Sequence, residues 1–218
     1  MPYDSNHPTA DNKDPVANAL VSIRLTMAAE GKYSNNPRDP GGETVWGIAR
    51  NRIKDWPFWP RWDQLKKSMG WTAASEAPET LAAVAYWYQN APDGPWVKVR
   101  GSDISSQWIA DELFDTATNT GPAVAAAFLQ RTLNVLNRSD LAGAPLWEEL
   151  EVKGGIGPKT LGALRAALAR GMGPAVFQYL NALQGAFYIE LAEHKPKFEA
   201  FVRGWALRLA DRNMKEFR

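Results

Sequence analysis

The sequence predicts a mainly α-helical protein with at most a small β element close to its start. In several segments apolar residues recur at steps of three and four, which is the period of one face of a helix. Segment 31–47 differs, because prolines and glycines crowd it and exclude a long helix there. We expect tight turns or a short hairpin in this segment, and no convincing strand run occurs outside it.

The first helix is expected to begin at Asp14-Pro15, an N-cap residue followed by a proline at the first helical position. Gly31 is a natural stop at the C-terminal end of this helix. Glu30 continues the apolar stripe, so we expect its carboxyl group at the end of the helix, on the face turned toward the core. The stripe itself consists of Val16, Leu20, Ile23 and Met27.

The rest of the chain is expected to be mainly helical, with turns and loops between the helices. A helix is expected to begin near Ile48, but residues 55–74 are rich in tryptophan, contain two prolines and are predicted to form an aromatic loop or cap. Residues 154–160 are predicted to form a turn. The remaining helices are expected at 79–89, 105–118, 123–136, 159–170, 174–194 and 197–216.

Composition excludes most catalytic chemistries other than that of carboxylates. The 218 residues include no Cys, which excludes a thiol nucleophile, thiolate metal sites and a disulfide framework. His7 and His194 are the only histidines and lie far apart in sequence, so a Ser/His/Asp triad or a histidine metal site has little to build on. A net charge of +1 does not point to nucleic acid. We therefore expect no metal, no cofactor and no nucleic-acid partner.

The start of the chain carries no visible targeting segment. Residues 1–13 are polar and are expected to form a flexible arm without the apolar stretch of a signal peptide. No run approaches the roughly 18 apolar residues of a membrane span. We expect synthesis in a host cytoplasm, so that passage to an external substrate would depend on another component.

Glu30, Asp39 and Thr44 are the candidate catalytic residues. Hydrolysis of a glycosidic bond needs an acid that keeps its proton near neutral pH, which partial desolvation of a carboxyl group achieves. Glu30 is placed for this role, Asp39 lies in a polar loop that would keep it ionised, and Thr44 could hold a water molecule. Spacing alone leaves alternatives open: Glu30 as a solvated surface residue, Asp39 as a turn residue, and Glu43 in the role of Asp39.

Residues 30–48, EGKYSNNPRDPGGETVWGI, resemble the signature of glycoside hydrolase family 108. That signature opens with Glu-Gly-Gly-Tyr, continues through Asn-Asp-Pro-x-Asp-Pro-Gly-Gly and ends near Thr-x-x-Gly-Ile. The resemblance implies a lysozyme-like fold with a helical C-terminal region. It also places the catalytic Glu of the family at Glu30.

Two residues depart from the family pattern. Lys32 replaces a glycine and Asn36 replaces the usual Asp. The positive charge of Lys32 would oppose the protonated state of a nearby acid. The interval from Glu30 to Asp39 is also similar to that of phage lysozymes, in which Glu, Asp and Thr act together, although Thr44 comes one residue earlier than the Thr of those enzymes.

Motifs further along the chain extend the resemblance over about residues 16–210. FDTATNTGP at 114–122 and GIGPKT at 155–160 look like parts of the predicted peptidoglycan-binding region that accompanies the family. GIGPKT is alternatively a purely structural turn. The expected regions are a flexible arm at 1–13, a lysozyme-like catalytic region at 14–110 that includes the 55–74 insertion, and a helical peptidoglycan-binding region at 111–218.

Tyr33, Trp46, Asp115 and Asn119 are the expected substrate-binding residues. Aromatic rings are the usual platforms for sugar faces, although most of the ten tryptophans are expected to pack in the core. Tyr33 either lines the cleft or only packs on it. Asp115 and Asn119 either contact the substrate or stabilise the end of their helix.

The resemblance implies an N-acetylmuramidase that hydrolyses the β-1,4 bond between N-acetylmuramic acid and N-acetylglucosamine in bacterial peptidoglycan, causing cell-wall lysis. The alternatives are a lytic transglycosylase, which uses one acid/base Glu and no water, and a non-catalytic wall-binding protein. The expected partner is the glycan strand at the periplasmic cell wall, and the protein is expected to be a monomer. A holin would release it in the case of a phage endolysin, whereas a bacterial secretion pathway is the other possible setting.

Overall fold

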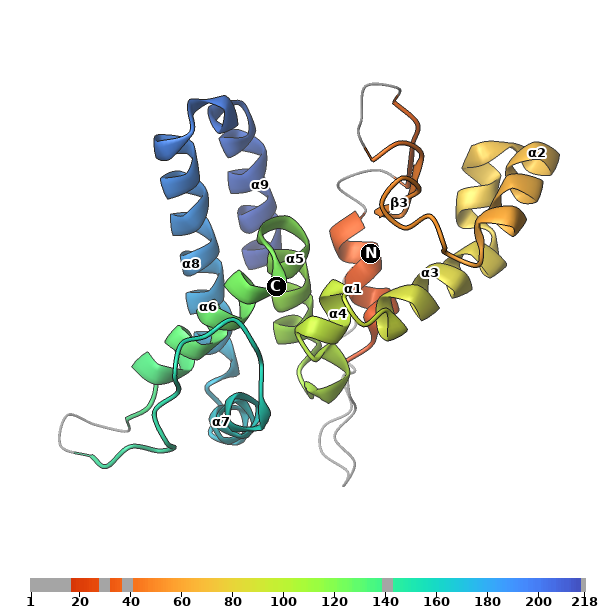
Figure 1. Cartoon of the computed structure of the whole chain (residues 1–218). Helices are drawn as coiled ribbons and strands as arrows, with labels where there is room; N and C mark the ends of the chain where they lie inside the picture. The colour runs from red at the N-terminus through yellow and green to blue at the C-terminus, as the bar shows by residue number, and fades with distance from the viewer. Residues whose placement is uncertain (1–16, 28–31, 37–40, 139–142, 217–218) are drawn as a thin grey trace. The chain divides into compact units, whose positions relative to one another are not determined.

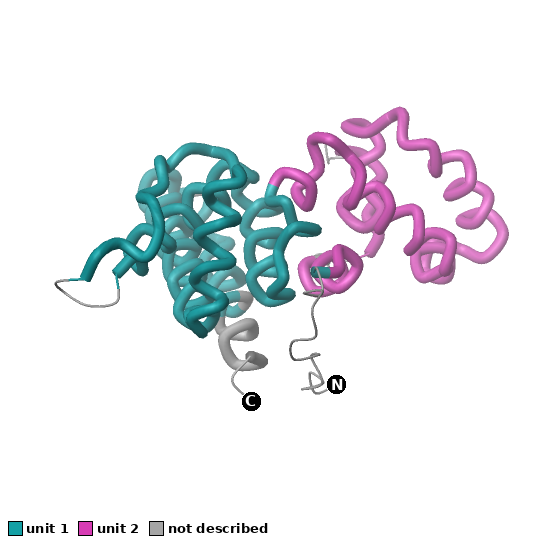
Figure 2. The backbone as a smooth tube through the Cα atoms, turned by 90° about the horizontal axis from the view of Figure 1, so that it is seen from below, with its two compact units in different colours: residues 1–17, 99–218 teal, residues 18–98 magenta. Residues whose placement is uncertain are grey.

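A computed structural model shows a mainly helical protein with a small antiparallel sheet, which confirms the fold class predicted from the sequence (Figure 1). Contacts group the chain into two compact units, residues 18–98 and residues 99–218 together with 1–17 (Figure 2). The boundary expected near residue 110 stays a prediction. The structure describes residues 17–27, 32–36, 41–138 and 143–216.

Helix α3 (Pro78–Asn90) is central among the helices of the 18–98 unit. It packs against α1 (Ala19–Met27), α2 (Trp59–Glu76) and α4 (Pro95–Lys98) (Figure 1). A proline occupies the first turn of α3, where its missing N–H would have no partner within the helix. The helix predicted in this part of the chain is confirmed.

Helix α1 begins later than predicted. The N–H of Ala17 donates to the carbonyl of Ile104 at 2.9 Å, and neither Ala17 nor Asn18 is helical. The Oδ1 of Asn18 accepts a hydrogen bond from the N–H of Leu20 at 2.9 Å, so Asn18 caps the helix. The helical start expected at Asp14-Pro15 lies outside the described residues, and the expected helical path through Ala17 and Asn18 is wrong.

A three-stranded antiparallel sheet follows α1 in the sequence. Its strands are β1 (Tyr33–Ser34), β2 (Thr44–Val45) and β3 (Ile48–Ala49), in the order β1-β2-β3. The β1-β2 pair confirms the hairpin predicted in this segment. The sheet is short, and residues 35–43 connect β1 to β2.

The turn between β2 and β3 explains why no helix begins near Ile48. Trp46 and Gly47 have φ values of 49° and 78°, and two consecutive positive values are typical of a type I′ hairpin turn. This turn reverses the chain and pairs Ile48 with Val45. The helix expected at this point is therefore wrong.

Residues 55–74 form most of a helix and not the aromatic loop that their composition predicts. Pro60 lies in the first turn of α2, where a proline is tolerated, and Pro57 precedes the helix. Gly70 interrupts the helix with φ 78° and ψ 160°, a conformation that is essentially confined to glycine. Helix α2 is therefore kinked at Gly70, and the expectation of a loop was wrong because its prolines stand at the start of the helix.

The 99–218 unit is built from packed helices, as the apolar patterns predict. Helix α5 packs against α6 and α8, while α6 also contacts α7 and α8 also contacts α9 (Figure 1). Ile109, Leu113 and Phe114 of α5 are fully buried and form part of its core. No helix in the part of the chain that the structure describes is long and apolar enough to cross a membrane. The elements are η1 (Gly101–Asp103), α5 (Gln107–Thr120), α6 (Pro122–Val135), α7 (Pro158–Ala169), α8 (Gly173–His194), η2 (Pro196–Phe198) and α9 (Glu199–Glu216).

Candidate active site

Thr44 is the one predicted catalytic residue that falls within the described chain, since Glu30 and Asp39 lie outside it. Thr44 belongs to β2, where it pairs with Ser34 of β1. Its side chain is partly exposed, and its hydroxyl donates to the carbonyl of Gly42 at 3.1 Å. The hydroxyl oxygen keeps lone pairs with which it can accept a hydrogen bond from a water molecule.

The double glycine before Glu43 has a structural reason. The carbonyl of Gly41 accepts a hydrogen bond from the N–H of Asn51 at 3.0 Å. Gly42 has a φ of 68°, and a Cβ at this position would lie 2.6 Å from Nδ2 of Asn51. The chain that follows Asp39 is therefore held close against Asn51 in a way that glycine permits.

Glu43 is the centre of a charge network in the 18–98 unit. Its side chain is only 9% exposed. Its Oε1 accepts hydrogen bonds from the Tyr33 hydroxyl and from Nε1 of Trp62, each at 3.1 Å, and is also paired with Lys66. Its Oε2 lies 2.9 Å from Nε of Arg50. Oε1 is thus engaged by three hydrogen-bond donors and Oε2 by an ion pair.

This network keeps Glu43 ionised. Burial opposes the charged form, but hydrogen bonds from Lys66 and Trp62 and the two neighbouring positive charges outweigh it, so the pKa of Glu43 is lowered from its ordinary value of 4.5. A general acid needs a proton near neutral pH, which Glu43 does not hold. The arrangement also favours Asp39 over Glu43 for the second carboxylate, because the oxygens of Glu43 face protein groups.

Arg50 extends the network to the exposed side of α2. Its guanidinium donates to both carboxylate oxygens of Asp63, at 3.1 and 2.6 Å, and its Cζ lies 4.2 Å from the ring centroid of Trp59. The hydrogen bond from Arg50 lowers the pKa of Asp63. Sequence reasoning missed these residues. The available signal was the spacing of Trp62 and Lys66, which are four residues apart. This spacing places two residues on the same face only if the segment is helical.

Tyr33 is a half-buried ring fixed on several sides. Its hydroxyl donates to Glu43, and its ring centroid lies 5.2 Å from that of Trp71 and 5.7 Å from that of Trp62. Burial, followed by the negative charge of Glu43, raises the pKa of Tyr33 above 10.0. Tyr33 is therefore a neutral ring in a fixed orientation at the first position of β1.

Trp46 is packed into the interior of the 18–98 unit. It is 3% exposed, and its Nε1 donates to the carbonyl of Ser75 at 2.8 Å. Its own carbonyl accepts a hydrogen bond from the Tyr88 hydroxyl at 2.9 Å. The Trp46 ring links the β2-β3 turn to α2, and the backbone carbonyl of Trp46 links the turn to α3. Contact with a sugar would require the ring to leave this packed position.

Lys32, which replaces a family glycine, is paired with Glu76 at the end of α2. The two side chains are 48% and 45% exposed. The Nζ of Lys32 also lies 5.7 Å from the ring centroid of Trp46. The charge of Lys32, which follows the candidate acid by two residues in sequence, is thus partly balanced by Glu76.

Asp115 and Asn119 lie on α5 of the 99–218 unit, where both side chains make contacts within and between helices. Asp115 is fully buried, and one of its carboxylate oxygens accepts a hydrogen bond from Nε2 of Gln184 at 3.1 Å. The side chain of Asn119 donates to the backbone carbonyl of Asp115 at 2.9 Å. These contacts fit a role in stabilising α5 and its packing on α8. Substrate contact at either residue stays a prediction.

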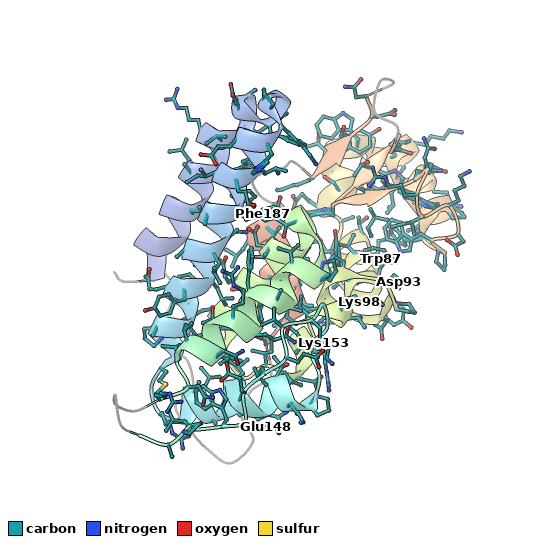
Figure 3. All side chains as sticks on the ribbon, turned by 60° about the vertical axis from the view of Figure 1, so that its left-hand side comes forward. Trp87, Asp93, Lys98, Glu148, Lys153 and Phe187 are labelled. Carbon is teal, nitrogen blue, oxygen red and sulfur yellow. The ribbon has the colours of Figure 1, made fainter. Side chains whose placement is uncertain are left out.

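Side chains of α6 hold the segment that leads to the GIGPKT turn. Gln130 is 2% exposed; its Nε2 donates to the carbonyl of Gly155 and its Oε1 accepts from the N–H of Lys153, each at 2.8 Å. Lys153 is labelled in Figure 3. Asn134 makes a similar pair of bonds with the backbone of Leu150, at 2.8 and 2.9 Å. This anchoring fits a structural turn, because side-chain amides replace the backbone partners that a loop lacks.

Comparisons with known proteins agree with the motifs in the sequence. Residues 23–121 match the family model described as Glycosyl hydrolase 108, and residues 124–210 match the model described as Predicted Peptidoglycan domain. A search of curated proteins gave no match. The chain is similar in fold to the structure of Brucella abortus SagA, with 23% sequence identity and a TM-score of 0.52 over 89% of this chain and 91% of that chain.

Proposed function

We propose that this chain, whose residues 23–121 belong to glycosyl hydrolase family 108, is an N-acetylmuramidase. The two family matches make it a glycoside hydrolase of the bacterial cell wall. The proposal adds the bond, the β-1,4 linkage from N-acetylmuramic acid to N-acetylglucosamine, and the residues that cleave it. Residues 124–210 would hold the peptidoglycan strand.

In the proposed mechanism Glu30 protonates the leaving oxygen as general acid. Asp39 stays ionised and either orients the attacking water or stabilises the positive charge that develops on the sugar. The Thr44 hydroxyl accepts a hydrogen bond from that water. A water between the two carboxyl groups implies inversion at the anomeric carbon, for which the groups lie about 6.5–9.5 Å apart.

The engagement of Glu43 is the observation that carries this assignment of roles. Glu43 adjoins Thr44 in sequence and is a carboxylate of the right type, yet three hydrogen-bond donors and the ion pair with Arg50 hold it ionised. Asp39 is then the carboxylate of the β1-β2 connection that remains for the reaction. Thr44, one residue beyond Glu43, presents a partly exposed hydroxyl from the adjoining strand.

Digestion of purified peptidoglycan tests the proposal. The wild type should release fragments with reducing ends, whereas Glu30→Gln should abolish release while the fold stays intact by circular dichroism. Glu79→Gln is a matched control, because Glu79 is an exposed carboxylate of the same unit, paired with Arg61. Anhydro-muramic ends in the mass spectrum would establish the transglycosylase instead. Wall binding without fragment release would establish a non-catalytic protein, and substantial activity of Glu30→Gln would remove Glu30 from the mechanism.

The biological setting forms part of the proposal. Action at periplasmic peptidoglycan as a monomer fits a phage endolysin that a holin releases, and it also fits a muramidase of a bacterial secretion pathway. Co-expression with a holin separates the two settings: an endolysin should lyse the host cell only when the holin is present.

A further inference from the structure

We propose that Trp71 and Tyr33 form a platform on which one sugar ring of the glycan strand stacks. The inference rests on the proposed function and adds a binding subsite to it. The two rings are stacked with centroids 5.2 Å apart and planes inclined by 20°. Trp71 is 51% exposed, so that a large part of its surface remains accessible although it rests on Tyr33.

The backbone at Gly70 accounts for the position of Trp71. The φ of 78° and ψ of 160° at Gly70 break the regular path of α2, and Trp71 is the next residue. An L side chain rarely adopts this conformation, and a Cβ at Gly70 would meet no atom within 4 Å. Local crowding therefore does not explain the glycine, whereas the change of direction before Trp71 does.

The platform is rigid on its inner side. The Tyr33 ring also lies against the fully buried Trp62, and both the Tyr33 hydroxyl and Trp62 Nε1 donate to the same oxygen of Glu43. Trp71 thus rests on a ring whose tilt is set by packing and by a hydrogen bond. A surface fixed before binding loses little conformational freedom when a ligand arrives, which favours a specific contact.

The position of the platform in the fold favours the glycan as its occupant. Tyr33 is followed in β1 by Ser34, which pairs with Thr44, the proposed water-binding residue. A sugar ring offers an apolar C–H face together with polar hydroxyls. An amphipathic aromatic surface suits that face while neighbouring polar groups remain hydrated.

The test uses the full chain with Glu30→Gln, which prevents turnover, and a purified peptidoglycan tetrasaccharide of alternating N-acetylglucosamine and N-acetylmuramic acid. We expect Trp71→Ala to weaken binding in calorimetry by about tenfold, and Trp71→Phe to restore most of it. Tyr86→Ala is the matched control, since Tyr86 is an aromatic residue of the same unit that is 70% exposed. Thermal unfolding checks that each variant is folded.

The outcomes separate this inference from the proposed function. The platform would be refuted if Trp71→Ala bound the tetrasaccharide as tightly as the Glu30→Gln parent chain. It would also be refuted if Tyr86→Ala weakened binding as much as Trp71→Ala does, or if the parent chain did not bind the tetrasaccharide. In chains that keep Glu30, Trp71→Ala should raise KM and leave kcat close to the wild-type value. A wild-type chain that binds the glycan through Trp71 but releases no fragments would support the binding platform and would refute the proposed muramidase activity.

Discussion

Replacing Glu43 by glutamine should destabilise the 18–98 unit far more than an ordinary surface change. Glutamine keeps an oxygen that can accept from Trp62, but it removes the charge that pairs with Arg50 and Lys66. Its new amide N–H groups also face groups that are themselves donors. We therefore expect the loss of both ion pairs together with imperfect hydrogen bonding.

The burial of the partners sets the size of the effect. Removing one member of a fully buried ion pair costs about 3–5 kcal/mol, because the remaining charge has no partner. Arg50 and Lys66 are 30% and 32% exposed, so water can partly solvate their charges after the substitution. We expect Glu43→Gln to lower the free energy of unfolding by about 2–3 kcal/mol.

Urea unfolding followed by tryptophan fluorescence measures this difference, and its pH dependence carries a sign. The pKa of folded Glu43 lies below the ordinary value of 4.5, so its stabilisation is fully present above the pKa of the unfolded chain. The stabilisation is lost as pH falls through the lower pKa of the folded state. The gap between wild type and Glu43→Gln should therefore be widest near pH 7 and should close under acidic conditions.

Asp63→Asn is the control for this experiment. Asp63 also pairs with Arg50, but its side chain is 49% exposed, and exposed pairs contribute about 0–1 kcal/mol. A Glu43→Gln loss no larger than that of Asp63→Asn would refute the reasoning. A gap that widens toward acidic pH would refute it as well.

Two further predictions concern Lys32 and Gln130. Lys32→Gln should move the alkaline limb of the pH–activity profile to higher pH by roughly a few tenths of a pH unit at low salt, because a positive charge near Glu30 favours loss of its proton. The shift should become smaller as salt is added. A shift to lower pH would contradict the assignment of Glu30 as the acid. Gln130→Ala should lower the free energy of unfolding of the 99–218 unit by about 2–3 kcal/mol in urea, because buried hydrogen bonds to Lys153 and Gly155 are lost. A loss below about 1 kcal/mol would show that the segment does not depend on this anchor.

The elements that the sequence predicts correctly are those with a local signal. Most helices follow from apolar spacing, because the period of a helix is written within a few neighbouring residues. The failures concern signals whose meaning depends on position. Pro60 is compatible with a helix only because it falls in the first turn of α2, and Ile48 is in a strand only because Trp46 and Gly47 take positive φ values.

The candidate site likewise contains residues that a local sequence motif reveals and residues that only the structure reveals. The signature around Glu30 is contiguous, so it can be found without a structure. The partners of Glu43 cannot be found in this way, because Tyr33, Trp62 and Lys66 are 10, 19 and 23 residues away from it in sequence. No local pattern marks such contacts, so the sequence alone does not distinguish Glu43 from Asp39 as the second carboxylate.

The balance of charge in the network bears on how the proposed acid could keep its proton. Glu43 and Asp63 are matched by the two cations Arg50 and Lys66, so the network ties the residue before β2 and the residue after β3 to α2 without adding a net charge. A net positive site would favour loss of the proton from a nearby acid, and a net negative site would favour its retention. A balanced network does neither to a first approximation. In the proposed mechanism, desolvation of the acid is then the main means of keeping its proton, and the network supplies rigidity beside Thr44 in β2.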